Sequence, residues 1–248
     1  MNEFKTVELF GYSIFTSELG QINLESKCVI NTLNQYSYMI AERDPLFKKA
    51  LLSSDILLPD GVGILAASKL IKGKRIIKIA GYDMHEFLLD KLNIAKGKCF
   101  YLGSSNNTLN KIKKRIAIDY PNISVECFSP PFKTKFSDEE NSSIVEKINL
   151  FQPNILFVGM TAPKQEKWIH EHKDQLNVNI LCSVGAVFDF YAGTIKRPKQ
   201  FWIDMGMEWI VRLSHEPRRM WKRYLFYGPI FLTKILKMKL DIMLNKEI

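Results

Sequence analysis

The sequence has 248 residues, of which 46% are apolar, 25% are charged and 12% are aromatic. This composition excludes a disordered chain, because it provides enough apolar surface for a full hydrophobic core. The longest uncharged run, from Ile148 to Pro163, is shorter than the roughly 20 residues that a membrane-spanning helix needs, which argues against an integral membrane protein.

Positive charge is concentrated near the end of the chain. The whole sequence carries a net charge of +9. Residues 196–248 contain twelve basic and five acidic residues, a net of +7, whereas residues 1–195 carry only +2. We therefore divide the chain into a body, residues 1–195, and a basic appendage, residues 196–248. A basic segment of this kind suits an anionic partner such as a diphosphate, a membrane surface or a nucleic acid.

Cysteine spacing and the N-terminal sequence bear on the cellular compartment. The four cysteines stand far apart and show neither a disulfide framework nor a zinc-binding pattern. The first residues, MNEFKTVELFGYSIF, lack the basic region, apolar stretch and cleavage site of an export signal. Both features predict a cytoplasmic protein.

Short apolar runs alternate with segments of helical spacing along the body. This alternation predicts an α/β fold with a Rossmann-like, mostly parallel sheet flanked by helices, followed by a helical appendage. Strands are expected within residues 27–34, 55–63, 98–105, 123–131, 153–163 and 179–190. Helices are expected within residues 35–54, 64–73, 106–120, 138–151 and 164–176.

Parallel sheets bind ligands beyond the carboxyl ends of their strands, where helix N-termini offer free N–H groups to anions. Small and polar residues follow each predicted strand and allow a ligand to approach the backbone. These strand-end residues are Thr32, Asn34, Asp60, Gly61, Gly63, Gly103, Ser104, Ser105, residues 159–165 and residues 185–189.

Asp60, in the segment LLPDG, has two interpretations. Asp-Gly is a common turn pair, and spacing alone favours a structural role for the carboxylate. A carboxylate in a partly dry cleft can also act as a general base. Gly61, Gly63 and Ala66, with Asp83 further on, fit a dinucleotide-binding pattern as well, although Pro59 and Asp60 separate the apolar run from the first glycine.

The segment FVGMTAPKQEKWI places Lys164 and Gln165 at the start of a predicted helix. A cation and an amide at this position suit a phosphate or a nucleotide, whereas a plain helix start with a solvated lysine accounts for them equally well. His170 and His172 are two residues apart and point to different sides of that helix, so they do not form a metal pair.

The appendage combines aromatic and basic residues. Arg212, Glu216, Arg219 and Arg223 fall at helical spacing, with Pro217 expected to start a new helix. After Pro229 the apolar residues form a stripe, and lysines lie off it. This composition favours a membrane-surface helix over a helical layer that only packs against the body. The stripe consists of Leu232, Ile235, Leu236, Leu240, Met243 and Leu244.

Four stretches together resemble the WecG/TagA/CpsF glycosyltransferase family, over about Cys28 to Leu225. They are DILLPDGVGI, IAGYDMHEFLL, FVGMTAPKQEKWI and the long run that begins SVGAVFDFYAGTIKRPKQFW and ends at EPRRMWKRYL. The resemblance implies an inverting enzyme that requires no metal and no cofactor. It would transfer an N-acetylmannosamine-type sugar from a UDP donor to a polyprenyl-diphosphate-linked sugar, peripherally bound at the inner face of the cell membrane.

The resemblance also implies roles for particular residues. Asp60 corresponds to the general base, Thr32 and Asn34 to an active-site pair, and Gln165 to a conserved amide. The appendage arginines that would close over the site are Arg212, Arg218, Arg219 and Arg223. The remaining expected substrate-binding residues are Gly61, Lys78, Gly81, Asp83, Gly103, Gly159, Lys164, Glu166, Gly185 and Arg197.

Two positions depart from the family pattern: Lys78 stands where arginine is common, and Thr161 where glycine is common. Lysine keeps the charge but lacks the planar fork that grips a phosphate with two hydrogen bonds.

Two other functions compete with the transferase: a nicotinamide-dependent oxidoreductase, based on the glycines around Asp60, and a nucleic-acid-binding protein, based on the basic aromatic appendage. Because the charge is local to the appendage, we expect a membrane and a diphosphate as its partners and no nucleic acid. The sequence leaves open a homo-oligomer, the donor sugar and the final polymer.

Overall fold

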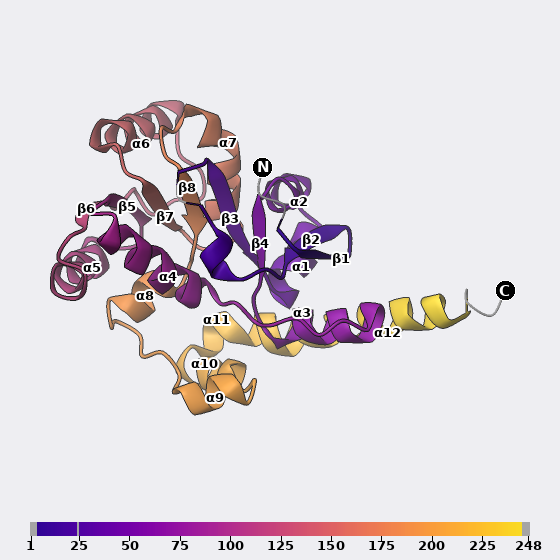
Figure 1. Cartoon of the computed structure of the whole chain (residues 1–248). Coiled ribbons are helices and arrows are strands. Elements are labelled where there is room, and N and C mark those ends of the chain that lie inside the picture. The colour runs from indigo at the N-terminus through magenta and orange to yellow at the C-terminus, as the bar shows by residue number, and fades with distance from the viewer. Residues whose placement is uncertain (1–3, 24, 245–248) are drawn as a thin grey trace.

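A computed structural model describes residues 4–23 and 25–244 of the chain. It contains a six-stranded parallel sheet with the strand order β4-β3-β8-β7-β5-β6 (Figure 1). The predicted fold class is confirmed, and each of the six predicted strand stretches contains one strand. The strands are β3 (Cys28–Leu33), β4 (Ile56–Pro59), β5 (Lys98–Gly103), β6 (Ser124–Phe128), β7 (Ile155–Gly159) and β8 (Ile180–Ser183).

Helices cover both faces of this sheet because its strands are apolar on both sides. Tyr101 and Phe157 pack on one face with α4 (Gly81–Ile94), α5 (Asn106–Asp119) and α8 (Val187–Tyr191). Their neighbours Phe100 and Leu156 point to the opposite face and pack with α6 (Asp138–Phe151) and α7 (Lys164–His172). Since all six strands run the same way, their carboxyl ends lie along one edge of the sheet.

An antiparallel hairpin precedes the sheet and was not predicted. It consists of β1 (Thr6–Leu9) and β2 (Tyr12–Phe15), joined by a tight turn in which Phe10 and Gly11 both have positive φ. The apolar side chains of both strands are buried, and the polar residues Thr6, Glu8 and Ser13 are exposed. Helix α4 was also not among the predicted helices. A short 3-10 turn, η1 (Leu19–Gln21), follows the hairpin.

Helices near β4 complete the body. The predicted helix over residues 35–54 is split into α1 (Gln35–Ala41) and α2 (Pro45–Leu52). The predicted helix over residues 64–73 corresponds to α3 (Val62–Ala67), which continues into the wider turn η2 (Ser68–Lys72). Helix α7 ends in another short turn, η3 (Lys173–Gln175).

The appendage is helical, as predicted. It contains α9 (Gln200–Asp204), α10 (Glu208–His215), α11 (Pro217–Trp221), η4 (Lys222–Phe226) and α12 (Tyr227–Leu244). Pro217 is the first residue of α11, as expected, and helical structure continues without a break over residues 217–244. Figure 1 shows α9, α10 and α11 below the sheet and α12 extending to one side. Within residues 4–23 and 25–244, no helix is long and apolar enough to cross a membrane.

Helix α12 is anchored on the body by two buried side chains. Phe231 and Ile235 belong to the same apolar cluster as Leu9, Tyr12 and Tyr38 from the hairpin and α1. Lys234 reinforces this contact through an ion pair of 2.8 Å with Glu42. The end of the appendage is thus built onto the beginning of the chain, and the division after residue 195 stays a prediction.

We expect Ile235→Ala to lower the free energy of unfolding by about 2–4 kcal/mol, because it removes a fully buried side chain from this cluster. Leu236→Ala, one residue further and half exposed, is the matched control and should cost less than about 1 kcal/mol. Urea unfolding of both variants measures the difference; equal losses would contradict the anchoring of α12 by Ile235.

Candidate active site

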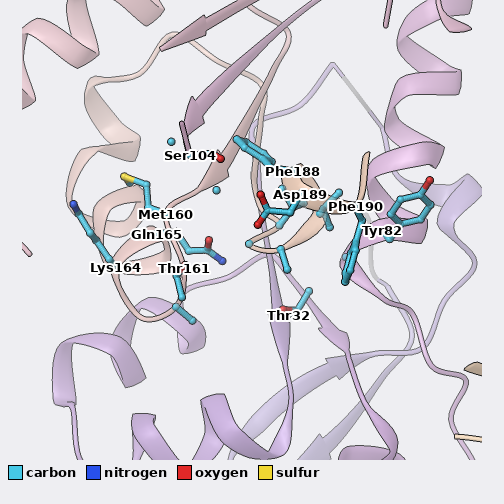
Figure 2. Close-up of a pocket in the computed structure, with 18 of the residues that line it drawn as sticks. Thr32, Tyr82, Ser104, Met160, Thr161, Lys164, Gln165, Phe188, Asp189 and Phe190 are labelled. Carbon is cyan, nitrogen blue, oxygen red and sulfur yellow. The ribbon is translucent and has the colours of Figure 1, made fainter. Parts of the chain in front are cut away.

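A cavity of about 620 Å³ lies at the carboxyl edge of the sheet, between the body and the appendage (Figure 2). A second cavity of about 70 Å³ shares Asn34, Asp60, Glu208, Arg212 and Arg223 with it. Most of the sequence-predicted site residues line the larger cavity: Thr32, Asn34, Asp60, Gly81, Gly103, Gly159, Lys164, Gln165, Glu166, Gly185, Arg197, Arg212, Arg219 and Arg223. Gly61 and Lys78 line the smaller one.

Asp60 directly follows β4 and lines both cavities. Its N–H group donates a hydrogen bond of 2.9 Å to the carbonyl of Leu33 at the end of β3, which fixes the backbone. Gly61 then turns the chain with φ +92°, a conformation that glycine adopts most easily, and α3 begins. Burial raises the pKa of the Asp60 carboxyl, and nearby Glu208 raises it further. A carboxylate with a raised pKa is a stronger base.

Asn34 holds the Asp60 carboxylate in place. Its side-chain oxygen caps α1 by accepting a hydrogen bond of 2.9 Å from the N–H of Ser37, and the Ser37 hydroxyl accepts one of 2.8 Å from the N–H of Asn34. Because the cap uses the amide oxygen, the NH₂ group is left to donate to Asp60, a hydrogen bond that lowers the pKa of this carboxyl. Asn34 therefore orients the candidate base.

Lys78, from the body, forms an ion pair of 2.5 Å with Glu208, from α10 of the appendage. Arg212 lies one helical turn further, 4.0 Å from the same carboxylate. Both cations lower the pKa of Asp60, against the larger effect of burial. Lys78 thus stands close enough to Asp60 to influence its charge, but its ammonium group is already engaged by an acidic residue of the appendage.

Besides Arg197, which pairs with Asp83, three arginines from the helices of the appendage line the same cavity: Arg212, Arg219 and Arg223. Arg219 pairs with Glu216 at 2.7 Å, and Arg223 lies over the ring of Tyr36. Burial lowers the pKa of Arg223, and the charges of the other two arginines add to this effect. Such mutual repulsion is relieved when an anion binds between the guanidinium groups, so this part of the cavity suits a diphosphate.

Gln165 and Glu166 open α7 and are almost completely buried, with 4% and 2% of their surfaces exposed. The Gln165 amide donates a hydrogen bond of 2.9 Å to Glu166 Oε1. Gln165 Oε1 and Glu166 Oε2 have no partner among the described residues. Figure 2 shows the Gln165 amide pointing into the cavity, toward the side of Thr32 and Asp189. Both oxygens are therefore free to accept a hydrogen bond from a ligand.

Glycines shape the floor of the cavity. A side chain at Gly103, φ +118°, would come within 2.5 Å of the carbonyl oxygen of Gly159, and one at Gly159 would meet the ring of Phe188 at 2.7 Å. The ends of β5 and β7 can approach so closely only without side chains. Gly185 lies beside the Gln165 amide, and Gly81 begins α4.

Some predicted residues point elsewhere. The Lys164 ammonium donates to the carbonyl of Lys133 at 2.5 Å and lies over the Phe136 ring, and in Figure 2 it points away from Gln165. Asp83 lines neither cavity; it accepts hydrogen bonds from the N–H of Ala80 and from Arg197, at 3.1 and 2.9 Å. Arg218 is exposed and also lines neither cavity.

The turn whose glycines suggested a dinucleotide site is covered by a side chain of the protein itself. Gln35 lies over Gly61 and Gly63, and a side chain at Gly63 would come within 3.0 Å of Gln35 Oε1. The space that a pyrophosphate would need above this turn is therefore filled. Thr161 has φ +69°, a backbone conformation that favours glycine and explains why glycine is common at this position of the family.

Several cavity residues were not predicted from the sequence. Glu208 is the most important, since it contacts Lys78 and influences Asp60. Phe190 lies below the Arg212 guanidinium, and Phe132 lines the cavity from the loop after β6. An acidic residue within a basic segment was the signal that could have revealed Glu208. Over residues 4–23 and 25–244, no group of three or more His, Cys, Asp or Glu side chains could hold a metal ion.

The partly buried carboxylate of Asp60 and a cluster of arginines thus share one cavity at the carboxyl edge of a parallel sheet. This arrangement defines an enzyme that can activate a nucleophile next to an anionic leaving group. The sequence model described as "Glycosyl transferase WecG/TagA/CpsF family" matches residues 13–244. The chain belongs to this glycosyltransferase family, and the match extends beyond Leu225, where the motifs recognised in the sequence ended.

Similar proteins are N-acetylglucosaminyldiphosphoundecaprenol N-acetyl-β-D-mannosaminyltransferases. The protein of Bacillus spizizenii strain W23 is 32% identical over 225 residues, covering 90% of this chain and 85% of the relative. The protein of Bacillus subtilis strain 168 is 30% identical, covering 87% and 82%. The Staphylococcus aureus MW2 protein is 30% identical, covering 85% and 80%.

The buried carboxyl of Glu166 makes stability depend on pH. Burial raises the pKa of Glu166 to about 7, so between about pH 4.5 and 7 the folded protein keeps a proton that the unfolded chain has released. The free energy of unfolding should therefore fall as pH rises through this range, by up to about 3 kcal/mol.

Glu166→Gln removes this ionisation. We expect the variant to gain stability relative to the wild type between pH 5 and pH 8, as measured by thermal unfolding at each pH. Glu146→Gln, at an exposed position of α6, removes the same charge and is the control. A stability difference for Glu166→Gln that is the same at both pH values would contradict this assignment.

Proposed function

We propose that this enzyme transfers N-acetylmannosamine from a UDP donor to a polyprenyl-diphosphate-linked N-acetylglucosamine, with inversion at the anomeric carbon. The acceptor and the sugar are those in the names of the relatives from Bacillus and Staphylococcus. One observation carries the proposal: the Asp60 carboxylate and three arginines, Arg212, Arg219 and Arg223, line the same cavity. A base for a hydroxyl and a site for a diphosphate are what this reaction requires.

In the proposed reaction, the Asp60 carboxylate takes the proton of the acceptor hydroxyl. The hydroxyl oxygen forms a bond to the anomeric carbon of the donor while the bond from that carbon to the UDP oxygen breaks. The electron pair of the broken bond leaves with UDP. The raised pKa of Asp60 favours this proton transfer, and Asn34 keeps the carboxylate aimed at the acceptor.

The arginines would stabilise the charge that develops on the leaving diphosphate. Arg223 suits this role best, because it lacks an ion-pair partner within the described part of the chain. Charged donors that are already in place need no rearrangement during the reaction, and their effect is large in a cavity with little water. With this positive charge supplied by side chains, we propose that the reaction needs no metal ion.

Thr32 and Gln165 would position the sugars. Thr32 lies near the end of β3 beside the cavity, and Gln165 presents an oxygen without a partner among the described residues. A hydroxyl or an acetamido N–H group of a substrate can satisfy that oxygen. Backbone groups near Gly103, Gly159 and Gly185 border the same space.

We also propose that the protein binds peripherally to the inner face of the cell membrane, where a lipid-linked acceptor is held. The apolar stripe predicted on α12 divides into two sets in the fold. Ile235 is buried against the body, while the other members are about half exposed on the opposite side: Leu232, Leu236, Leu240, Met243 and Leu244. A helix that packs with one face and exposes large apolar side chains on another suits a membrane surface.

Replacement of the proposed base tests the mechanism. We expect Asp60→Asn to lower kcat by about 10²–10⁴-fold, because the amide keeps the shape but cannot take a proton. Release of UDP from UDP-N-acetylmannosamine with a short-chain lipid diphosphate acceptor measures the rate. The shift in melting temperature that UDP causes should persist and shows that the fold and the donor site are intact. Turnover near the wild-type rate would refute the assignment of the base.

The arginine cluster offers a matched pair of variants. Arg223→Gln should weaken UDP binding about 10–100-fold, since it removes charge-assisted hydrogen bonds to the diphosphate. Arg218→Gln makes the same chemical change on an exposed residue outside both cavities and should leave binding unchanged. Isothermal titration of both variants with UDP measures the effect. Equal affinities for the two variants would show that Arg223 does not hold the diphosphate.

A further inference from the structure

A second basic and apolar surface lies on the body, outside the appendage. Residues 69–78, KLIKGKRIIK, contain five basic residues and no acidic one. They cover the end of η2 and the segment that follows it, where Gly73 ends the helical turn with φ +67°. The near-neutral net charge of the body concealed this local concentration.

The side chains of this segment separate into an inner and an outer set. Ile71 and Ile76 pack against the apolar cluster that contains Phe231 and Ile235 of α12. Leu70 and Ile77 point outward, and Ile77 is 82% exposed. The cations of the segment are exposed as well, apart from Lys78, which pairs with Glu208: Lys69, Lys72, Lys74 and Arg75. Because so little of the Ile77 side chain is buried, it contributes almost no hydrophobic stabilisation to the fold.

The segment lies next to the exposed apolar face of α12. Helix α12 packs directly against η2 and α3, and Figure 1 shows these elements running alongside one another. On α12, Lys234 is engaged by Glu42, which leaves Lys237 and Lys239 to act on a partner. Residues 69–77 carry four exposed cations, whereas Lys237 is exposed and Lys239 only partly exposed. The larger part of the positive charge at this side of the molecule therefore comes from the body.

We infer that residues 69–77 and α12 together form one surface that binds an anionic lipid membrane, with Lys72, Lys74 and Ile77 of the body as essential contacts. The inference deepens the proposed function, on whose membrane-linked acceptor it rests. Cations attract the negative headgroups, and Leu70 and Ile77 enter the boundary of the acyl chains beside Leu236 and Leu240 of α12. The surface combines cations with exposed apolar side chains. This combination favours an anionic lipid membrane over a nucleic acid, because a nucleic acid has no acyl chains into which Leu70 and Ile77 could insert.

Vesicle sedimentation without any substrate tests the surface. The full-length protein is mixed with phosphatidylcholine vesicles that contain or lack phosphatidylglycerol. We expect the wild type to bind the anionic vesicles and to lose binding at high salt. Lys72→Gln/Lys74→Gln should weaken binding about 30-fold, and Ile77→Ser about tenfold.

Matched controls come from α5, on another part of the body (Figure 1). Lys111→Gln/Lys114→Gln removes two exposed lysines, and Ile118→Ser removes an isoleucine that is 79% exposed. These variants should bind vesicles like the wild type. Thermal unfolding shows that every variant is folded, and turnover of a water-soluble acceptor analogue should be unchanged for Lys72→Gln/Lys74→Gln and Ile77→Ser.

The possible outcomes separate the inference from the proposed function. If Leu236→Glu/Leu240→Glu abolishes vesicle binding while Lys72→Gln/Lys74→Gln and Ile77→Ser bind normally, α12 docks alone and the inference is wrong, although the membrane proposal stands. If the wild type does not bind anionic vesicles, both are wrong. Binding to single-stranded DNA in place of vesicles, lost in the lysine variant, would also overturn the inference.

Discussion

The ion pair between Lys78 and Glu208 joins the body to the appendage directly beside Asp60, and the character of the site depends on it. Asp60 owes its raised pKa first to burial; among the charges of the appendage, Glu208 raises this pKa further and Arg212 lowers it. Without α10, Lys78 would lack its ion-pair partner, and Asp60 would lose the effects of Glu208 and Arg212 on its pKa. Asp60 and helix α10 of the appendage are therefore electrostatically coupled, because the charges on α10 shift the pKa of Asp60.

This coupling also explains how a lysine can stand where the family commonly has arginine. A guanidinium group at residue 78 could grip a phosphate with two parallel hydrogen bonds, whereas the Lys78 ammonium acts as a point charge. In the fold, the Lys78 ammonium forms an ion pair of 2.5 Å with Glu208. In the proposed reaction, Arg212, Arg219 and Arg223 bind the diphosphate. Arg219 and Arg223 are four residues apart in the helical stretch that begins at Pro217, so they lie on one side of it, and Arg218 falls on another side.

The sequence predicted the parallel sheet and its carboxyl edge correctly, since its strands are short, mainly apolar runs followed by polar turns. Most residues expected at the site, Asp60 among them, line the cavities for this reason. The hairpin β1–β2 was missed because four alternating residues are too few to distinguish a strand from a loop. Glu208 and the direction of Lys164 depend on partners more than thirty residues away in the chain, which no local pattern encodes.

The near-neutral net charge of the body hides a local basic segment. The net charge of +2 for residues 1–195 is a sum over the whole body. It conceals a segment, residues 69–78, that contains five cations and no anion. Folding packs this segment against α12, the last helix of the basic appendage. Two arginines of the cavity, Arg219 and Arg223, and the exposed apolar side chains of α12 belong to one continuous helical stretch, residues 217–244. A membrane that binds α12 and residues 69–77 would therefore hold the mouth of the cavity at the headgroup level, where the diphosphate of a lipid-linked acceptor lies.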